Sequence, residues 1–168
     1  MRGRILTVST IMVLVAAILT TGCDSPAKKY YKEASRHEDR GDYEAAIASL
    51  NKSVAADAGY VRAYAKIGEI YLDRADYARA QEHLEKAIEV DPDYAKSYRR
   101  LSKTYRYQGK FAEALSTCQK ALERPAVRRD TKEKARLEEE ISKIKEEQQK
   151  AENPEPDKTD ASKTIETD

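Results

Sequence analysis

Apolar residues recur along the middle of the chain with the spacing of amphipathic helices. A first stripe has spacings of three and four positions, so its members share one helical face: Tyr64, Ile67 and Tyr71. A second stripe with the same kind of spacing follows: Ala80, Leu84, Ala87 and Ile88. The short break Ala75-Asp76 separates the two stripes. The pattern predicts two helices joined by a tight turn.

The two-helix pattern occurs three times with a period of 34 residues and without a gap, over residues 27–60, 61–94 and 95–128. Position 4 is always tyrosine: Tyr30, Tyr64 and Tyr98. Position 20 is always alanine, which lets the two helices of a pair approach closely: Ala46, Ala80 and Ala114. The break falls at the same place each time: Gly41-Asp42, Ala75-Asp76 and Gly109-Lys110. A fixed period of this length is typical of a solenoid of stacked helix pairs.

These positions resemble the tetratricopeptide repeat (TPR) family, in which each unit is a pair of antiparallel helices. The middle copy carries the most signature residues: Tyr64, Ile67-Gly68, Tyr71, Ala80, Leu84, Ala87 and Asp91-Pro92. The first copy departs from the pattern at Glu33, His37 and Ala58, and the third has its proline one place early, at Pro125. The resemblance implies an all-α, right-handed α-solenoid in which neighbouring pairs bury one another's apolar surface.

A solenoid also needs a polar end. Residues 129–151 are rich in Lys and Glu and have a narrow apolar stripe: Leu137, Ile141 and Ile144. Asp130, with Glu133 three residues later, is typical of a helix N-cap. We therefore predict a C-terminal capping helix over 129–151, with a free charged helix or a coiled-coil strand as the alternative. Residues 152–168 carry two prolines, no aromatic residue and one aliphatic residue, which predicts a disordered tail.

The N-terminal segment has a different composition. Arg2 and Arg4 are the only charges in the first 23 residues, and an apolar run covers residues 5–19. This is typical of an export signal. The sequence Leu19-Thr20-Thr21-Gly22-Cys23 resembles the lipobox of bacterial lipoproteins. The resemblance implies that residues 1–22 are a cleaved signal peptide and that Cys23 carries acyl chains such as palmitate. An uncleaved signal anchor is the alternative.

Residues 23–26 would then be a short tether that keeps the repeats close to the lipid surface. Asp24 resembles the signal that retains lipoproteins on the outer leaflet of the inner membrane, with the outer membrane as the alternative. Each of these readings leaves the repeats outside the cytoplasm.

Composition and charge exclude several function classes. The chain of 168 residues has 31 Lys+Arg against 30 Asp+Glu, so it lacks the basic excess of a nucleic-acid-binding protein. Two cysteines cannot form a disulfide-rich scaffold or a four-cysteine zinc site. Neither His37 nor His83 has a cysteine or carboxylate at metal spacing, and no catalytic motif is present. We therefore expect neither an enzyme, a cofactor nor a metal, and we expect Cys118 to replace a buried leucine of the other copies.

The TPR resemblance implies a groove lined by the first helix of each copy. Its positions carry over to these residues: Lys28, Tyr31, Ser35, Asp39, Arg62, Glu69, Asp73, Lys96, Arg99, Arg100, Lys103, Arg106 and Tyr107. Acidic residues gather in the first two copies and cations in the third. We predict that the groove docks an extended or helical peptide whose acidic part lies over the third copy. A solvated helix face is the alternative.

Some TPR proteins bind the C-termini of chaperones with a basic clamp. Lys96 and Arg100 match two positions of that clamp, but Tyr31, Ser35 and Glu69 stand at the others, so a chaperone is not the expected partner. We predict a membrane-tethered adaptor that recruits another envelope protein. A self-associating structural scaffold is the alternative function.

Overall fold

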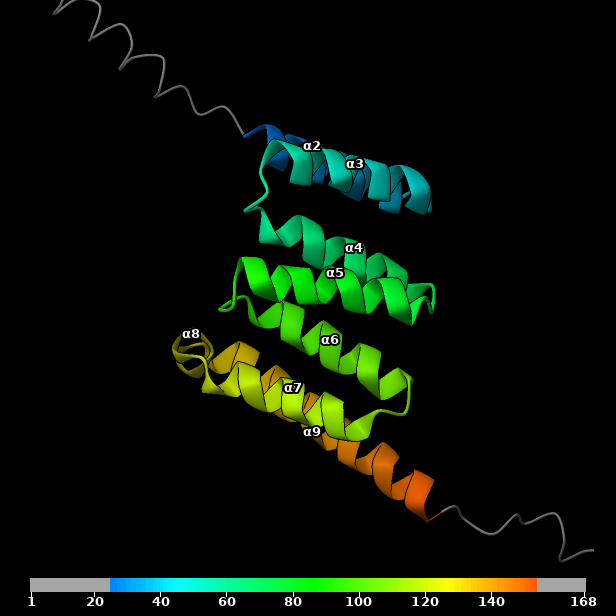
Figure 1. Ribbon diagram of the computed structural model, residues 1–168, viewed down its shortest axis with the longest axis vertical. Helices are drawn as coiled ribbons and strands as arrows, with labels where there is room; N and C mark the ends of the chain where they lie inside the picture. The colour runs from blue at the N-terminus through cyan, green and yellow to red at the C-terminus, as the bar shows by residue number, and fades with distance from the viewer. Residues whose placement is uncertain (1–24, 154–168) are drawn as a thin grey trace, which may run out of the picture.

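The computed structural model describes residues 25–153 (Figure 1). They form eight α-helices and no strand: α2 (Pro26–Glu38), α3 (Tyr43–Ala56), α4 (Val61–Asp73), α5 (Tyr77–Val90), α6 (Ala95–Tyr107), α7 (Phe111–Glu123), α8 (Pro125–Arg129) and α9 (Thr131–Glu152). The predicted signal segment, Cys23, Asp24 and the tail from residue 154 lie outside the described residues. Within the described part of the chain, no helix is both long enough and apolar enough to cross a membrane.

The helices stack in consecutive antiparallel pairs, α2 with α3, α4 with α5, and α6 with α7 (Figure 1). α3 contacts α4 and α5 contacts α6, so each pair packs on the next. The last described helix, α9, packs on both α6 and α7 and ends the stack. The predicted all-α solenoid with a capping helix is therefore confirmed.

The turn inside each pair has the same backbone conformation. Its left-handed residue is Gly41 (φ +77°), Ala75 (φ +58°) or Gly109 (φ +72°). The next residue begins the second helix of the pair as its N-cap. Asp42 and Asp76 accept hydrogen bonds from the backbone N–H groups of Ala45 and Arg79, whereas Lys110 has no side-chain cap. The turn is therefore best formed by a glycine followed by aspartate, and each copy after the first departs from that pair by one residue.

Small residues set the distance between paired helices. Ala46, Ala80 and Ala114 are fully buried. A Cβ atom on Gly68 would lie 2.5 Å from Cγ of Leu84, so α4 and α5 are in contact at a point where only glycine fits. The 34-residue period thus places small residues where the helices of a pair meet.

The capping helix begins and packs as the sequence predicts. Asp130 accepts hydrogen bonds from the backbone N–H groups of Lys132 and Glu133 at 3.0 and 3.1 Å. Leu137 and Ile144 are fully buried, and Ile141 packs beside them. The short helix α8, which the sequence analysis did not predict, leads the chain from α7 to α9 and buries Val127.

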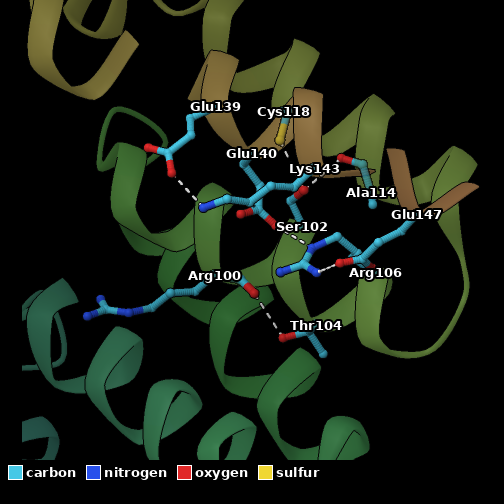
Figure 2. A network of polar contacts seen from close by, with 10 residues as sticks. All are labelled: Arg100, Ser102, Thr104, Arg106, Ala114, Cys118, Glu139, Glu140, Lys143 and Glu147. Atoms are coloured by element: carbon cyan, nitrogen blue, oxygen red, sulfur yellow. Dashed lines mark hydrogen bonds and ion pairs between the residues drawn. The ribbon is translucent and has the colours of Figure 1, made fainter. Parts of the chain in front are cut away.

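Cys118 is fully buried in the same core, as predicted from its repeat position. Its thiol donates to Oγ of Ser102 at 3.0 Å, and that hydroxyl donates to the carbonyl of Ala114 at 2.9 Å (Figure 2). Burial raises the pKa of the Cys118 thiol to about 11. The neutral thiol therefore behaves as a small apolar side chain, not as a nucleophile.

Candidate functional site

The first helices of the three pairs, α2, α4 and α6, form one continuous face of the stack, which we call the first-helix face. Side chains that join these helices show that they face the same side. Lys66 of α4 reaches Glu38 of α2, with Nζ 2.7 Å from Oε1. Glu69 of α4 reaches Arg100 of α6, with Oε1 2.5 Å from Nη2. The predicted groove residues of α2, α4 and α6 belong to this face.

A ladder of alternating charges crosses the first-helix face. Lys66 lies between Glu38 and Glu69, 3.1 Å from the latter, and Glu69 lies between Lys66 and Arg100. Burial alone would raise the pKa of Glu69, but Arg100 and Lys66 outweigh it and lower that pKa. Burial alone would lower the pKa of Lys66, and the carboxylates of Glu38 and Glu69 outweigh it and raise that pKa. The ladder residues therefore neutralise one another in the folded protein.

Tyr31 lies beside this ladder. Its ring meets that of Tyr60 edge to face, with the centroids 5.6 Å apart. Burial raises the pKa of the Tyr31 hydroxyl, and the positive charges of Lys66 and Arg100 partly offset that rise. Tyr94 is close enough to contribute to the same shift. The structure therefore brings Tyr31 and Tyr60 together beside the ladder.

Ser35 uses its hydroxyl within its own helix, because Oγ donates to the carbonyl of Tyr31 at 3.3 Å. The oxygen still has lone pairs for a ligand, and the side chain is partly exposed. At the other end of these helices Asp39 and Asp73 are exposed to solvent. The acidic end of the predicted groove is therefore accessible.

The basic end of the predicted groove is covered by α9. Arg106 is only 8% exposed, its Nε donates to Oε1 of Glu140 at 2.8 Å, and its Nη1 donates to Glu147 (Figure 2). Burial alone would lower the pKa of Arg106, but Glu140 and Glu147 outweigh it and raise that pKa. The prediction that Arg106 is open to a partner is therefore wrong, because a carboxylate pair of the same chain already holds its guanidinium.

Arg99 is covered by the same helix. Its Nε lies 3.8 Å from Oε2 of Glu133, and both of these atoms are buried. These contacts were not predicted from the sequence, although they follow the repeat period. Glu140 follows Arg106 by 34 residues, and Glu133 follows Arg99 by the same interval. The first part of α9 therefore corresponds to the first helix of a fourth copy, and each carboxylate stands at the same repeat position as its arginine.

Two further predicted residues form a cluster near the end of α6. Tyr107 is 46% exposed, and its ring lies under Nζ of Lys103 at 5.4 Å and under the Arg106 guanidinium at 4.7 Å. Tyr77 of α5 is 6.2 Å away, measured between ring centroids. Cations stacked on an aromatic ring are stabilised by its quadrupole. Lys103 and Tyr107 are therefore accessible but already in contact with each other.

The remaining predicted cations stand at the beginning of the three helices. Lys28, Arg62 and Lys96 occupy the same repeat position, the second residue of each 34-residue copy. Within residues 25–153, neither Arg62 nor Lys96 makes an ion pair. Lys96 lines a cavity of about 250 Å³ between the start of α6 and helices α8 and α9. Three carboxylates line the same cavity: Asp93, Asp130 and Glu133.

Among the described residues, no three His, Cys, Asp or Glu side chains are placed to hold a metal ion together. The first-helix face offers mainly charged and phenolic groups over a broad surface. Such a surface suits the recognition of another polypeptide.

Models of the tetratricopeptide repeat match residues 31–74 and residues 60–125. No curated protein sequence matches the chain. Among solved structures, the MamA protein is 29% identical with a TM-score of 0.57, over 64% of this chain and 58% of MamA. The chain thus spans less than two thirds of MamA.

Two other solved structures are TPR domains of chaperone-associated proteins. The second TPR domain of human RPAP3, in complex with the HSP70 peptide SGPTIEEVD, is 25% identical with a TM-score of 0.62, over 71% of this chain and 95% of that domain. The TPR2B domain in the pHsp70 complex of yeast Sti1 is 18% identical with a TM-score of 0.67, over 74% of this chain and 99% of that domain, which shows a common fold.

Proposed function

Because the chain belongs to the tetratricopeptide repeat family, we propose that it is a membrane-tethered adaptor of the bacterial cell envelope. It binds a peptide or helix of another envelope protein on the first-helix face. A role as a protein–protein interaction adaptor is supported by the family and by the peptide complex of the RPAP3 domain. Cys118 does not act as a nucleophile, because burial raises the pKa of its thiol to about 11.

The observation that carries this proposal is the unequal coverage of the first-helix face. Over α2, α4 and the first half of α6, Tyr31, Lys66 and Glu69 are partly exposed. Over the second half of α6, α9 buries Arg106. We therefore place the partner over the first two repeats and the start of the third, and not over the third repeat alone.

The tether rests on the lipobox-like sequence that ends at Cys23. The helix α2 begins at Pro26, so only two residues separate Cys23 from its first residue. A segment of this length can span at most about 10 Å. Acyl chains on Cys23 hold the repeats at a bilayer surface, since two chains anchor a protein durably. Asp24 favours the outer leaflet of the inner membrane over the outer membrane.

Metabolic labelling with a fatty-acid analogue tests the tether. The wild-type chain incorporates the label, and Cys23→Ser does not. Equal labelling of both chains would refute acylation at this residue. Loss of label together with retention in the membrane fraction would identify the N-terminal segment as an uncleaved anchor.

Capture of partners by crosslinking in cells tests the adaptor role. The variant Tyr31→Ala/Lys66→Ala removes a phenol and an ammonium from the first-helix face. The matched control Tyr43→Ala/Lys52→Ala removes the same groups from α3, where Tyr43 is 39% exposed. We expect the first variant alone to lose specific partners. Its melting temperature is measured as well, because Tyr31 packs on the core around Leu50 and Ile67 and the variant must stay folded under the conditions of capture. If both variants capture the same partners as the wild type, the proposal that partners bind on the first-helix face is wrong.

A self-associating scaffold is the second candidate, favoured by the outer face of the first pair. Among the described residues, no helix pair packs on the side of α2 and α3 that faces away from α4. Light scattering of the full chain in detergent, compared with the Tyr43→Ala variant, tests this alternative. A monomer at micromolar concentration would exclude it, whereas an oligomer that Tyr43→Ala dissociates would favour it.

A further inference from the structure

We propose that the outer side of α2 lies against the headgroups of an anionic lipid bilayer and that a row of four cations holds it there. These cations, which we call the basic row, are Lys29, Lys32, Arg36 and Arg40. The inference rests on the proposed tether at Cys23. It goes beyond the tether because it fixes which end of the stack touches the membrane.

The basic row follows one side of α2. Lys29, Lys32 and Arg36 are three and four positions apart, so they share one helical face, and Arg40 continues the same spacing in the turn after the helix. All four residues are exposed. Ala34, one of the two buried residues of α2, projects to the opposite side of the helix. The basic row therefore points away from the rest of the stack.

The basic row lies at the end of the stack where the chain would meet a bilayer. α2 and α3 form the end opposite to α9 (Figure 1). Among the described residues, no helix covers the outer side of this pair. Two residues separate Cys23 from α2, a span of at most about 10 Å. A bilayer that holds acyl chains on Cys23 is therefore within reach of the long side chains of the row.

Carboxylates at this end of the stack do not neutralise the basic row. Two of them flank the row, Glu33 and Asp39, and the four cations outnumber them. The only acidic residue of α3 is Glu44, and Arg74 of α4 holds it at 2.5 Å. The outer side of the first pair thus keeps an excess of positive charge.

The local fold does not account for the basic row. Lys29 stands in the first turn of α2, which has no acidic residue, and a cation there opposes the helix dipole. Lys32, Arg36 and Arg40 follow one another at intervals of four residues, where like charges repel. The row costs stability within the chain, and an anionic surface outside the chain offsets that cost.

The opposite end of the stack shows the contrast. α9 is also rich in Lys, but its carboxylates alternate with its cations. Ion pairs four residues apart form along its exposed side: Lys134 with Glu138, Lys143 with Glu139, and Lys150 with Glu146. An end that faces water alone is served by such mixed charges. Among residues 25–153, by comparison, Lys29, Arg36 and Arg40 make no ion pair.

A lipid surface fits this row better than a second copy of the chain does. A copy docked by the same end would bring two basic rows together, and like charges repel. Each Lys or Arg near an anionic bilayer, by contrast, strengthens its association about fivefold. With α2 on the bilayer, the stack stands on its first pair, α9 is the helix farthest from the lipid, and the first-helix face remains open at the side.

Acetylation of lysines on membrane-bound chains tests the inference. The full chain is reconstituted in vesicles of phosphatidylcholine alone and in vesicles that contain about one third phosphatidylglycerol. An uncharged acetylating reagent is used, so that the lipid does not repel it, and mass spectrometry gives the rate at each lysine. We expect Lys29 and Lys32 to react about tenfold more slowly on the anionic vesicles, and Lys132 and Lys145 of α9 to react equally on both.

Two variants show whether the row causes this protection. Arg36→Gln/Arg40→Gln removes half of the row and keeps both reporter lysines, so the protection should fall to about twofold or less. The control Arg128→Gln/Arg129→Gln removes two exposed arginines of α8, near the other end of the stack, and should keep the tenfold protection. Circular dichroism checks that both variants are folded. Equal rates on both kinds of vesicle, or equal losses in the two variants, would overturn the inference.

The remaining outcomes separate this inference from the tether and from another occupant. If the wild-type chain incorporates the fatty-acid label and Lys29 is not protected, the tether stands and the orientation is wrong. If the chain associates with neither kind of vesicle, both are wrong. If Lys29 is crosslinked to an acidic protein in cells and no vesicle protects it, a protein and not a lipid surface occupies this side of α2.

Discussion

Two sets of ion pairs lie on the first-helix face, and they differ in their exposure to water. One set joins α2, α4 and α6, and the other joins α6 to the capping helix α9. In the ladder between α2, α4 and α6, the side chains of Lys66 and Glu69 are 21% and 27% exposed. Between α6 and α9, the side chains of Arg106 and Glu140 are 8% and 10% exposed. The chemical groups are similar, and the difference lies in what covers them.

This difference separates a structural contact from a surface that can exchange partners. A buried charge that loses its partner is left without water, so α6 and α9 depend on each other strongly. A partly exposed pair contributes little to stability, because water and salt compete with it. The ladder can therefore be remodelled by a ligand at small cost, while the contact with α9 cannot.

The largest expected effect comes from breaking the buried pair on one side. Arg106→Met leaves the carboxylate of Glu140 buried without a partner and should lower the free energy of unfolding by about 3 kcal/mol. Urea denaturation followed by circular dichroism measures this change. The double variant Arg106→Met/Glu140→Met should recover most of the loss. A loss in the single variant no larger than that of a surface pair would contradict the role given to α9.

The second effect uses Cys118 as a reporter of the same region. The thiol is fully buried, and its pKa of about 11 keeps it protonated at pH 8, so a thiol reagent should modify it only when the third repeat opens. Arg106→Met should accelerate modification about tenfold or more, since opening becomes less costly. The measurement uses Cys23→Ser chains, so that Cys118 is the one thiol present. Unchanged rates would mean that α9 does not control this opening.

A smaller effect is expected in the ladder. Because the pKa of Glu69 is lowered in the folded protein, its charge stabilises the fold above its unfolded pKa, and this contribution is lost as the pH falls through the folded value. Glu69→Gln should cost less than about 1 kcal/mol at pH 7. The difference between wild type and variant should shrink as the pH falls below the ordinary glutamate pKa of about 4.3 and disappear below the lower pKa of the folded protein. A difference that grows on acidification would contradict the sign of this shift.

The smallest effect concerns the turn of the second repeat. Ala75 has a left-handed backbone, where Gly41 and Gly109 stand in the other two copies. Ala75→Gly should stabilise the fold by about 0.5–1 kcal/mol without changing either set of ion pairs. Thermal unfolding measures the gain. Combined with Glu69→Gln, it gives a chain of wild-type stability in which any loss of partner binding reflects the ladder alone.

Sequence predicted the elements of this fold because each depends on neighbouring residues. The stripe around Tyr64 and Ile67 defines a buried helical face, and the turn residues define where each helix ends. The position of Cys118 in the core followed from the leucines at the same repeat position. These features can be predicted from a single sequence because helical periodicity and turn conformation depend on residues close together in the chain.

The candidate site was predicted less completely, because long charged side chains on different helices must meet in space. The groove positions of Tyr31 and Glu69 follow from the repeat, but Lys66, which joins Glu69 to Glu38 of α2, was not among the predicted residues. Arg106 was predicted to bind a partner because the sequence shows its charge but does not show that α9 buries it. Which of two nearby carboxylates a cation meets depends on the relative heights of the helices, which single-helix patterns do not contain.

The 34-residue period continues into α9, and this also limits how the repeats can be exchanged. Positions 5 and 12 are both arginine in the third copy, at Arg99 and Arg106, whereas the second copy has Ala65 and Leu72 there, both buried. Only the third copy thus offers the charges that α9 requires. A longer protein built from these modules would have to keep the third copy and α9 together as one cassette and insert new units before it.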